Sequence, residues 1–150
     1  MKQSTEEKHF LNLAGEYGVC SELAKRGVHS SLTYGKQKAA DIIITDVDKD
    51  NKKAYVVEVK TSKTKRIVTG FFQKYHTPTT TPRPDFWVLV HINPETLLSD
   101  FYVLTHEEMA KEQMIRNKVT EWRKIDGVCN IELPQLEKYI NKWETIKNLI

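Results

Sequence analysis

Two ionisable residues interrupt an apolar segment that has the pattern of a β-strand, Ala54-Tyr-Val-Val-Glu-Val-Lys60. Successive side chains of a strand point to opposite faces, so Glu58 and Lys60 share one face while Val57 and Val59 share the other. A strand this apolar is expected inside a sheet, where a carboxylate and an ammonium group are costly unless they pair or bind an ion. The alternative is an exposed end of an edge strand that carries a modest Glu–Lys pair.

A second acid, Asp41, directly precedes the apolar run Ile42–Ile44. The polar segment Asp46–Lys53 then predicts a turn, so the strands 41–45 and 54–60 should form a hairpin. The hairpin would bring Asp41 to the Glu58–Lys60 end, and two carboxylates at a strand end make an oxygen site suited to magnesium. Taken alone, Asp41 would more often be an ordinary residue at the entry of a strand.

A third acid, Glu16, lies in a predicted helix from about Thr5 to Arg26. Ser4 and Glu7 have the spacing of a capping box, and Gly27 is a stop signal. On the helical wheel Glu16 falls within the apolar arc, where an acid needs a cation such as Lys60 as partner. The alternative is a glutamate at the margin of the arc that reaches water. The apolar arc predicted to face the core contains Phe10, Leu13, Ala14, Tyr17, Cys20, Leu23 and Ala24.

Basic residues are concentrated in the segment that follows the Glu58–Lys60 strand in the sequence. The net charge of the chain is only +3, but the segment 61–84 contains no Asp or Glu. A segment of one sign and this length is suited to contact phosphate groups, and a solvated loop is the alternative. Its basic residues are Lys63, Lys65, Arg66, Lys74 and Arg83.

The remaining elements predict an α/β fold with a mixed central β-sheet flanked by helices, in one domain over residues 1–150. The last helix should begin at Pro134, and its apolar stripe should pack on the sheet, with a dimer contact as the alternative. Pro-rich residues 77–84 predict a loop. The other predicted elements are strands at 28–34, 85–92 (central) and 100–104, and a helix from Thr105 to about Lys118. The stripe of the last helix contains Leu136, Tyr139, Ile140, Trp143, Ile146 and Ile150.

Several classes of protein are disfavoured by the sequence. No apolar run is long enough to span a bilayer, and the polar residues 1–8 do not resemble a signal peptide, so a cytoplasmic protein with no membrane partner is expected. Cys20 and Cys129 are far apart in the sequence, which favours two buried thiols over a disulfide or zinc site. The five histidines are scattered, and no phosphate-binding glycine loop is present.

The order of these features resembles the PD-(D/E)XK nuclease superfamily, which has the restriction-endonuclease-like fold. The resemblance is close over residues 14–62, in the segments Gly-Glu-Tyr-Gly-Val-Cys-Ser-Glu-Leu-Ala-Lys-Arg-Gly27, Ala-Asp-Ile-Ile-Ile44 and Val-Glu-Val-Lys-Thr-Ser62. The Phe-Trp-Val-Leu-Val strand and the segment that begins at Phe101 are similar to the rear half of small bacterial members. Ala40 replaces the proline of the family motif, but that position is not a metal ligand.

The resemblance implies a metal-dependent phosphodiesterase that cleaves DNA, either double-stranded or branched, with Mg²⁺ or Mn²⁺ as cofactor. By position, Asp41 and Glu58 would hold the metal together with the main-chain carbonyl of Val59. Lys60 would orient or deprotonate the attacking water, and Glu16 would support a second metal or its water shell. The DNA backbone would be held by Lys63, Lys65, Arg66 and Lys74.

Three functions compete with a simple DNA endonuclease. One is a structure-selective nuclease similar to a junction resolvase. Another is a module of the same fold that binds nucleic acid or a protein with little or no catalysis, and the last is an accessory subunit of a defence or mobile-element system. A homodimer is compatible with all of them, since cutting both strands of a duplex requires two sites.

Overall fold

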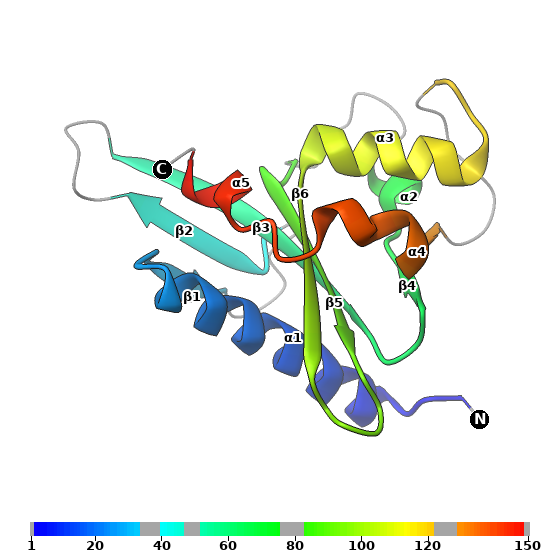
Figure 1. The fold of residues 1–150 in the computed structure, drawn as a ribbon, viewed down its shortest axis with the longest axis horizontal. Coiled ribbons are helices and arrows are strands. Elements are labelled where there is room, and N and C mark those ends of the chain that lie inside the picture. The colour runs from blue at the N-terminus through cyan, green and yellow to red at the C-terminus, as the bar shows by residue number, and fades with distance from the viewer. Residues whose placement is uncertain (1, 34–39, 47–51, 76–82, 122–128, 149–150) are drawn as a thin grey trace.

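The computed structural model describes residues 2–33, 40–46, 52–75, 83–121 and 129–148. Its centre is a five-stranded sheet with the order β1-β2-β3-β5-β6 (Figure 1). Every neighbouring pair is antiparallel except β3 and β5, which are parallel, so the sheet is mixed as predicted. The five strands are β1 (Ser30–Leu32), β2 (Ile42–Asp46), β3 (Lys53–Ser62), β5 (Phe86–Ile92) and β6 (Ser99–Thr105).

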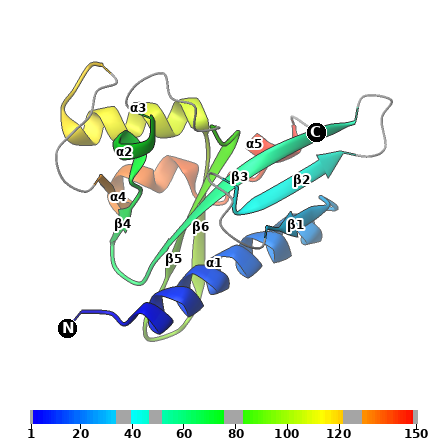
Figure 2. The same ribbon diagram turned by 180° about the vertical axis from the view of Figure 1, so that it is seen from behind.

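Helices cover both faces of the sheet (Figures 1 and 2). On one face α1 (Thr5–Lys25) packs through Val19 and Leu23 against the Val57–Val59 side of β3. The opposite face, to which Trp87 and Leu89 belong, carries the second core cluster. The elements on that face are α2 (Phe71–Tyr75), α3 (His106–Asn117), α4 (Leu133–Leu136) and a two-stranded sheet of β4 (Arg66–Val68) with β7 (Asn130–Glu132). The predicted α/β class is therefore confirmed.

The strands β2 and β3 form the predicted hairpin, but β3 is much longer than its partner. Their antiparallel ladder runs from Ile42 opposite Val57 to Asp46 opposite Lys53. Beyond Val57, β3 continues to Ser62 and pairs with β5 alone. The sheet consequently opens next to Glu58, and main-chain groups of β3 that point toward β2 have no strand to meet there.

Helix α1 begins at the predicted capping box. The Glu7 main-chain N–H donates to Ser4 Oγ at 3.1 Å, and the Ser4 N–H donates to a Glu7 carboxylate oxygen at 2.8 Å. The predicted apolar stripe is only partly right: Leu23 is buried and Cys20 packs against the core, but Phe10 and Tyr17 are 61% and 54% exposed. The helix instead packs against the sheet through a row of residues that are four apart in the sequence. A glycine in this row allows the helix to approach the sheet closely. The row comprises Leu11, Gly15, Val19 and Leu23.

The single C-terminal helix predicted from Pro134 is also wrong. The chain forms α4, a 3₁₀ turn (Glu137–Tyr139) and α5 (Glu144–Lys147). Between them Ile140 forms a β-bridge with Tyr102, and the Asn141 N–H donates to the Phe101 carbonyl at 2.8 Å. The chain thereby crosses the edge of β6, which a continuous helix could not do. Leu136 and Tyr139 pack on one face of the sheet, whereas Trp143 and Ile146 pack on the other.

Most other predicted elements are present with adjusted ends. The central strand, the following strand and helix α3 with its Thr105–Glu108 capping box are confirmed, while the predicted strand 28–34 is reduced to β1. Most of the turn 46–53 and of the loop 77–84 lies outside the described residues. Both cysteines are free thiols, with Cys129 buried and Cys20 only partly so. No helix in the described part of the chain has the length and apolar character needed to cross a bilayer.

Candidate active site

Asp41 lies where the β2–β3 ladder ends. Its main-chain N–H donates to the Val57 carbonyl at 3.1 Å, which places Asp41 opposite Glu58. Its carboxylate then accepts a hydrogen bond from the Val59 N–H at 2.7 Å. The side chain of Asp41 thus takes the place of the missing strand beside β3. This contact holds the carboxylate at the opening of the sheet.

Glu58 and Lys60 form an ion pair inside the sheet. Lys60 Nζ lies 3.0 Å from Glu58 Oε1. The side chain of Lys60 is 28% exposed and that of Glu58 is 3% exposed. At these two residues β3 pairs with β5 alone, but the side chain of Glu58 is buried, so the alternative of an exposed strand end is wrong. A carboxylate buried this deeply depends on the lysine, because removing one partner of such a pair leaves an uncompensated charge.

Glu16 reaches these residues from the other side of the sheet. The preceding residue, Gly15, lies so close to β3 that a Cβ atom there would be 1.8 Å from Thr61 Oγ1. Burial and the negative charges of Asp41 and Glu58 raise the pKa of Glu16 to about 7, while Lys60 lowers it. The structure therefore brings Glu16, Asp41, Glu58 and Lys60 into one electrostatic cluster.

Tyr75, at the end of α2, was not singled out by the sequence. Its side chain is 1% exposed, and its hydroxyl has no hydrogen-bond partner within the described residues. The ring packs edge-on against Trp87, the residue of β5 that pairs with Glu58. Burial and the charges of Glu58 and Asp41 raise the pKa of Tyr75. In sequence it reads as one more core aromatic, because only the fold places its hydroxyl near the acids.

The donor groups at this opening fit a hard divalent cation. Main-chain N–H and C=O of one strand residue point the same way, so the carbonyl of Val59 faces the side on which its N–H meets Asp41. With Asp41 and Glu58 this gives a ligand set of two carboxylates and one main-chain carbonyl. A site made of three or more acidic, His or Cys side chains does not occur among the described residues. Mg²⁺ uses one or two carboxylates and keeps waters or substrate phosphates as its other ligands. The buried hydroxyl of Tyr75 and the raised pKa of Glu16 are both consistent with a hydrated cation at this place.

The predicted DNA-contacting residues lie unequally around the cluster. Lys63 and Arg66 line a groove that ends at Lys60, although Arg66 is also paired with Glu132 at 3.1 Å. Lys65 lies on the far side of the same segment, near Pro134. The side chain of Lys74 lies outside the described part of the structure.

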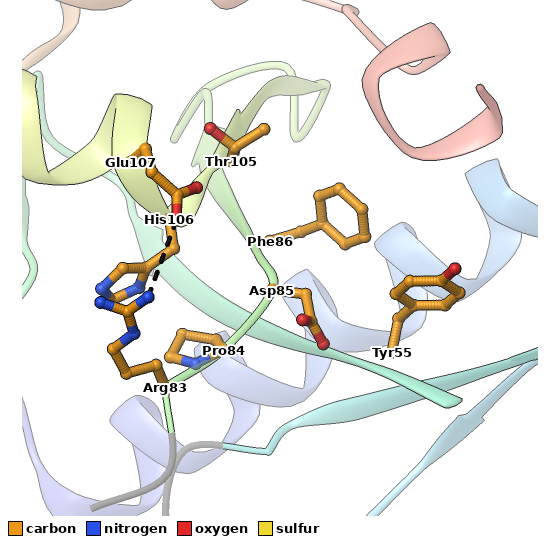
Figure 3. A pocket seen from close by; sticks show the side chains of 8 residues that line it. All are labelled: Tyr55, Arg83, Pro84, Asp85, Phe86, Thr105, His106 and Glu107. Carbon is orange, nitrogen blue, oxygen red and sulfur yellow. Dashed lines mark ion pairs between the residues drawn. The ribbon is translucent and has the colours of Figure 1, made fainter. Parts of the chain in front are cut away.

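A separate pocket of about 250 Å³ opens where β5 begins and β6 ends (Figure 3). Its acids already have partners: Asp85 accepts from the Val56 N–H at 2.8 Å, and Glu107 pairs with Arg83 at 3.8 Å. At its base His106 is 2% exposed and accepts a hydrogen bond from Trp87 Nε1 at 3.2 Å. Burial, as the largest cause, lowers the pKa of His106 to about 4. The pocket therefore contains structural contacts of the sheet end and none of the predicted site residues.

Comparison with solved structures identifies the fold. Over 97% of this chain and 92% of the other, the structure matches the bacterial homing endonuclease I-Ssp6803I with a TM-score of 0.57 at 18% sequence identity. No protein-family model matches the chain, and neither does any curated protein sequence. The resemblance drawn from the residues is thus confirmed at the level of the fold, which is restriction-endonuclease-like.

Proposed function

We propose that this chain is a metal-dependent DNA endonuclease. The observation that carries the proposal is the cluster of Glu16, Asp41, Glu58 and Lys60 at the opening between β2 and β3. A cluster of three acids with one lysine destabilises a fold, so a purely structural role gives no reason for it. The same arrangement suits hydrolysis of a phosphodiester.

Each residue of the cluster has a separate task in this proposal. Asp41, Glu58 and the Val59 carbonyl would hold Mg²⁺, which Mn²⁺ can replace. When bound, such a cation supplies charge stabilisation for the phosphate and acidifies a water molecule. Lys60, kept in place by Glu58, orients the attacking water and offsets negative charge that develops in the transition state. Glu16, whose pKa lies near neutrality, supports the water shell of the cation.

DNA as substrate is supported by the fold and by the charge around the cluster. The structurally similar protein is an endonuclease, and Lys63, Lys65 and Arg66 follow directly after the strand that carries Glu58 and Lys60. Together with Lys74 these cations would contact phosphates, which fixes the DNA in register with the acids without reading its sequence. Cleavage of both strands would need a second copy of the site, as in a homodimer.

The test is cleavage of supercoiled plasmid and of branched DNA by the purified chain in Mg²⁺, in Mn²⁺ and in EDTA. Asp41→Asn and Lys60→Ala should abolish cleavage in both metals. Matched controls are available at the other end of the same ladder, where Asp46 and Lys53 face each other. Asp46→Asn and Lys53→Ala should cleave as the unmodified chain does.

The outcomes separate the competing functions. Cleavage restricted to branched DNA would identify a structure-selective nuclease, while nicking of plasmid would identify a general endonuclease. DNA binding with no cleavage, unchanged by metal or by Asp41→Asn, would overturn the proposal in favour of a binding module. Cleavage that survives Lys60→Ala would also refute the assignment of the site.

A further inference from the structure

A groove of about 800 Å³, lined by Lys60 of the cluster, runs along the N-terminal half of α1. Figures 1 and 2 show this part of the helix beside the turn that joins β3 to β4. The helix forms one wall, and the end of β3 with the following turn forms the other. The polar residues that matter here are Lys2, Lys8 and Asn12 on the helix side, and Lys60, Lys63 and Arg66 on the strand side.

The groove is strongly cationic. Its described lining contains five basic side chains and one carboxylate, that of Glu7. The carboxylate is engaged in the capping box, where it accepts from the Ser4 N–H at 2.8 Å, and the positive end of the helix lies beside it. The net charge of the described lining is therefore positive, although Lys60 and Arg66 are paired with Glu58 and Glu132.

Residues of α1 connect the groove to the cluster. Lys8, Asn12 and Glu16 are spaced four apart, so they lie in one row along the helix. Each step of the row advances about 6 Å along the axis, which is comparable to the separation of neighbouring phosphates in a DNA strand. A strand that places one phosphate at Glu16 and Lys60 would therefore place the second phosphate beyond it near Lys8.

We propose that this groove binds the sugar–phosphate backbone of the DNA strand that is cut, on one side of the cleaved bond, with α1 as the second wall. The inference rests on the proposed nuclease function and adds contacts from Lys2 and Lys8, which the charge pattern of residues 61–84 does not include. The described lining has no aromatic side chain on which a base could stack. The groove consequently holds phosphates and contributes nothing to sequence preference.

Binding can be tested without cleavage, in EDTA, by fluorescence anisotropy with DNA duplexes of several sequences. Lys8→Gln and Lys63→Gln alter one wall each, and Lys111→Gln, on the exposed surface of α3, is the control. Each groove variant should reduce the slope of log affinity against log salt by about 0.9, which is about a 3.5-fold smaller loss of affinity between 50 and 200 mM salt. The change should be equal for all sequences and absent in Lys111→Gln.

Neutral methylphosphonates placed one at a time along the cut strand locate the contact. For the unmodified chain, the affinity for DNA should fall when a methylphosphonate replaces a phosphate on one side of the cleaved bond. The affinity of Lys8→Gln should not change when the second of these phosphates is replaced. Salt slopes equal to that of Lys111→Gln, or losses distributed on both sides, would overturn the proposal. If such a result is found while cleavage is normal, only the proposal that the groove binds DNA is refuted. If the salt slopes are as expected but the chain cleaves no DNA, only the proposed nuclease function is refuted.

Discussion

Replacing Glu16 by glutamine should stabilise the metal-free protein while impairing catalysis. The pKa of Glu16 is raised from 4.5 to about 7 because the residue is partly buried beside Asp41 and Glu58. Each pKa unit corresponds to about 1.4 kcal/mol, so the charged form of Glu16 opposes folding by at most about 3.5 kcal/mol at pH 8. Glutamine keeps the shape and the polar end of the side chain without the charge.

The pH dependence fixes the sign of this effect. Because the folded-state pKa of Glu16 is raised, its favourable contribution is complete below about pH 4.5 and is lost as pH rises through about 7. Urea unfolding at pH 8 in EDTA should therefore show Glu16→Gln more stable by about 1–3 kcal/mol, and the two proteins should converge at pH 4.5. In a chain of 150 residues, 1 kcal/mol corresponds to about 2–4 °C in Tm.

Two measurements could refute the reasoning. Equal or lower stability of Glu16→Gln at pH 8 would mean that Glu16 is not in repulsive contact with the other acids. Mg²⁺ should raise the Tm of the unmodified chain more than that of Glu16→Gln, since the cation relieves a repulsion that the variant no longer has. As a control, Glu22→Gln alters an acid of the same helix whose pKa is lowered by Lys25 and Arg26, so this variant should be destabilised slightly or unchanged.

Three further predictions concern the packing around the cluster. Gly15→Ala should destabilise the protein by about 1–3 kcal/mol in urea unfolding, because its Cβ would collide with the side chain of Thr61 and outweigh the gain in helix propensity. Tyr75→Phe should raise the free energy of unfolding by about 1 kcal/mol in EDTA, because a buried hydroxyl with no partner in the described structure is removed. In the Glu16→Gln background, stability should fall by about 2 kcal/mol from pH 7 to pH 5, because His106 with a pKa of about 4 stays neutral in the fold while the unfolded chain binds a proton.

Each of these predictions has its own control. Gly18→Ala places a Cβ 3.2 Å from the Phe101 ring, a milder contact than the one at Gly15, so it should destabilise the protein less, and equal effects of the two glycine variants would contradict the packing argument. A destabilised Tyr75→Phe would show that the hydroxyl is satisfied. His106→Gln should abolish the loss of stability between pH 7 and pH 5, because the unfolded chain then has no imidazole at this position to bind the proton.

The sequence predicts the strand side of the cluster well because a strand has a strict period of two. Once Val57 and Val59 face the core, Glu58 and Lys60 must share the other face, and the hairpin turn brings Asp41 to them. The same logic identifies the mixed sheet and its central strand. These inferences need only alternation and the direction of the chain, which are both visible in the order of residues.

The helical elements were predicted less well because their packing depends on contacts that hydrophobicity does not encode. On α1, Gly15 has little apolar surface, yet it makes the closest approach to the sheet, so the buried row differs from the most apolar arc. At the C-terminus the stripe from Leu136 to Ile146 fits one helix, but its residues belong to both faces of the sheet. Only the edge of β6, where Ile140 is bridged to Tyr102, makes the chain change direction.

The early end of the β2–β3 ladder links the fold to its chemistry. Because β2 begins at Ile42 while β3 continues to Ser62, the main chain at Val59 is reached by the carboxylate of Asp41 and not by another strand. The same gap admits Glu16, and the close contact at Gly15 leaves the rest of α1 and the end of β3 as two walls of a groove. A longer β2 would close the ladder and remove the opening altogether. The length mismatch within one hairpin is therefore the feature on which the meeting of the acids and the lysine depends.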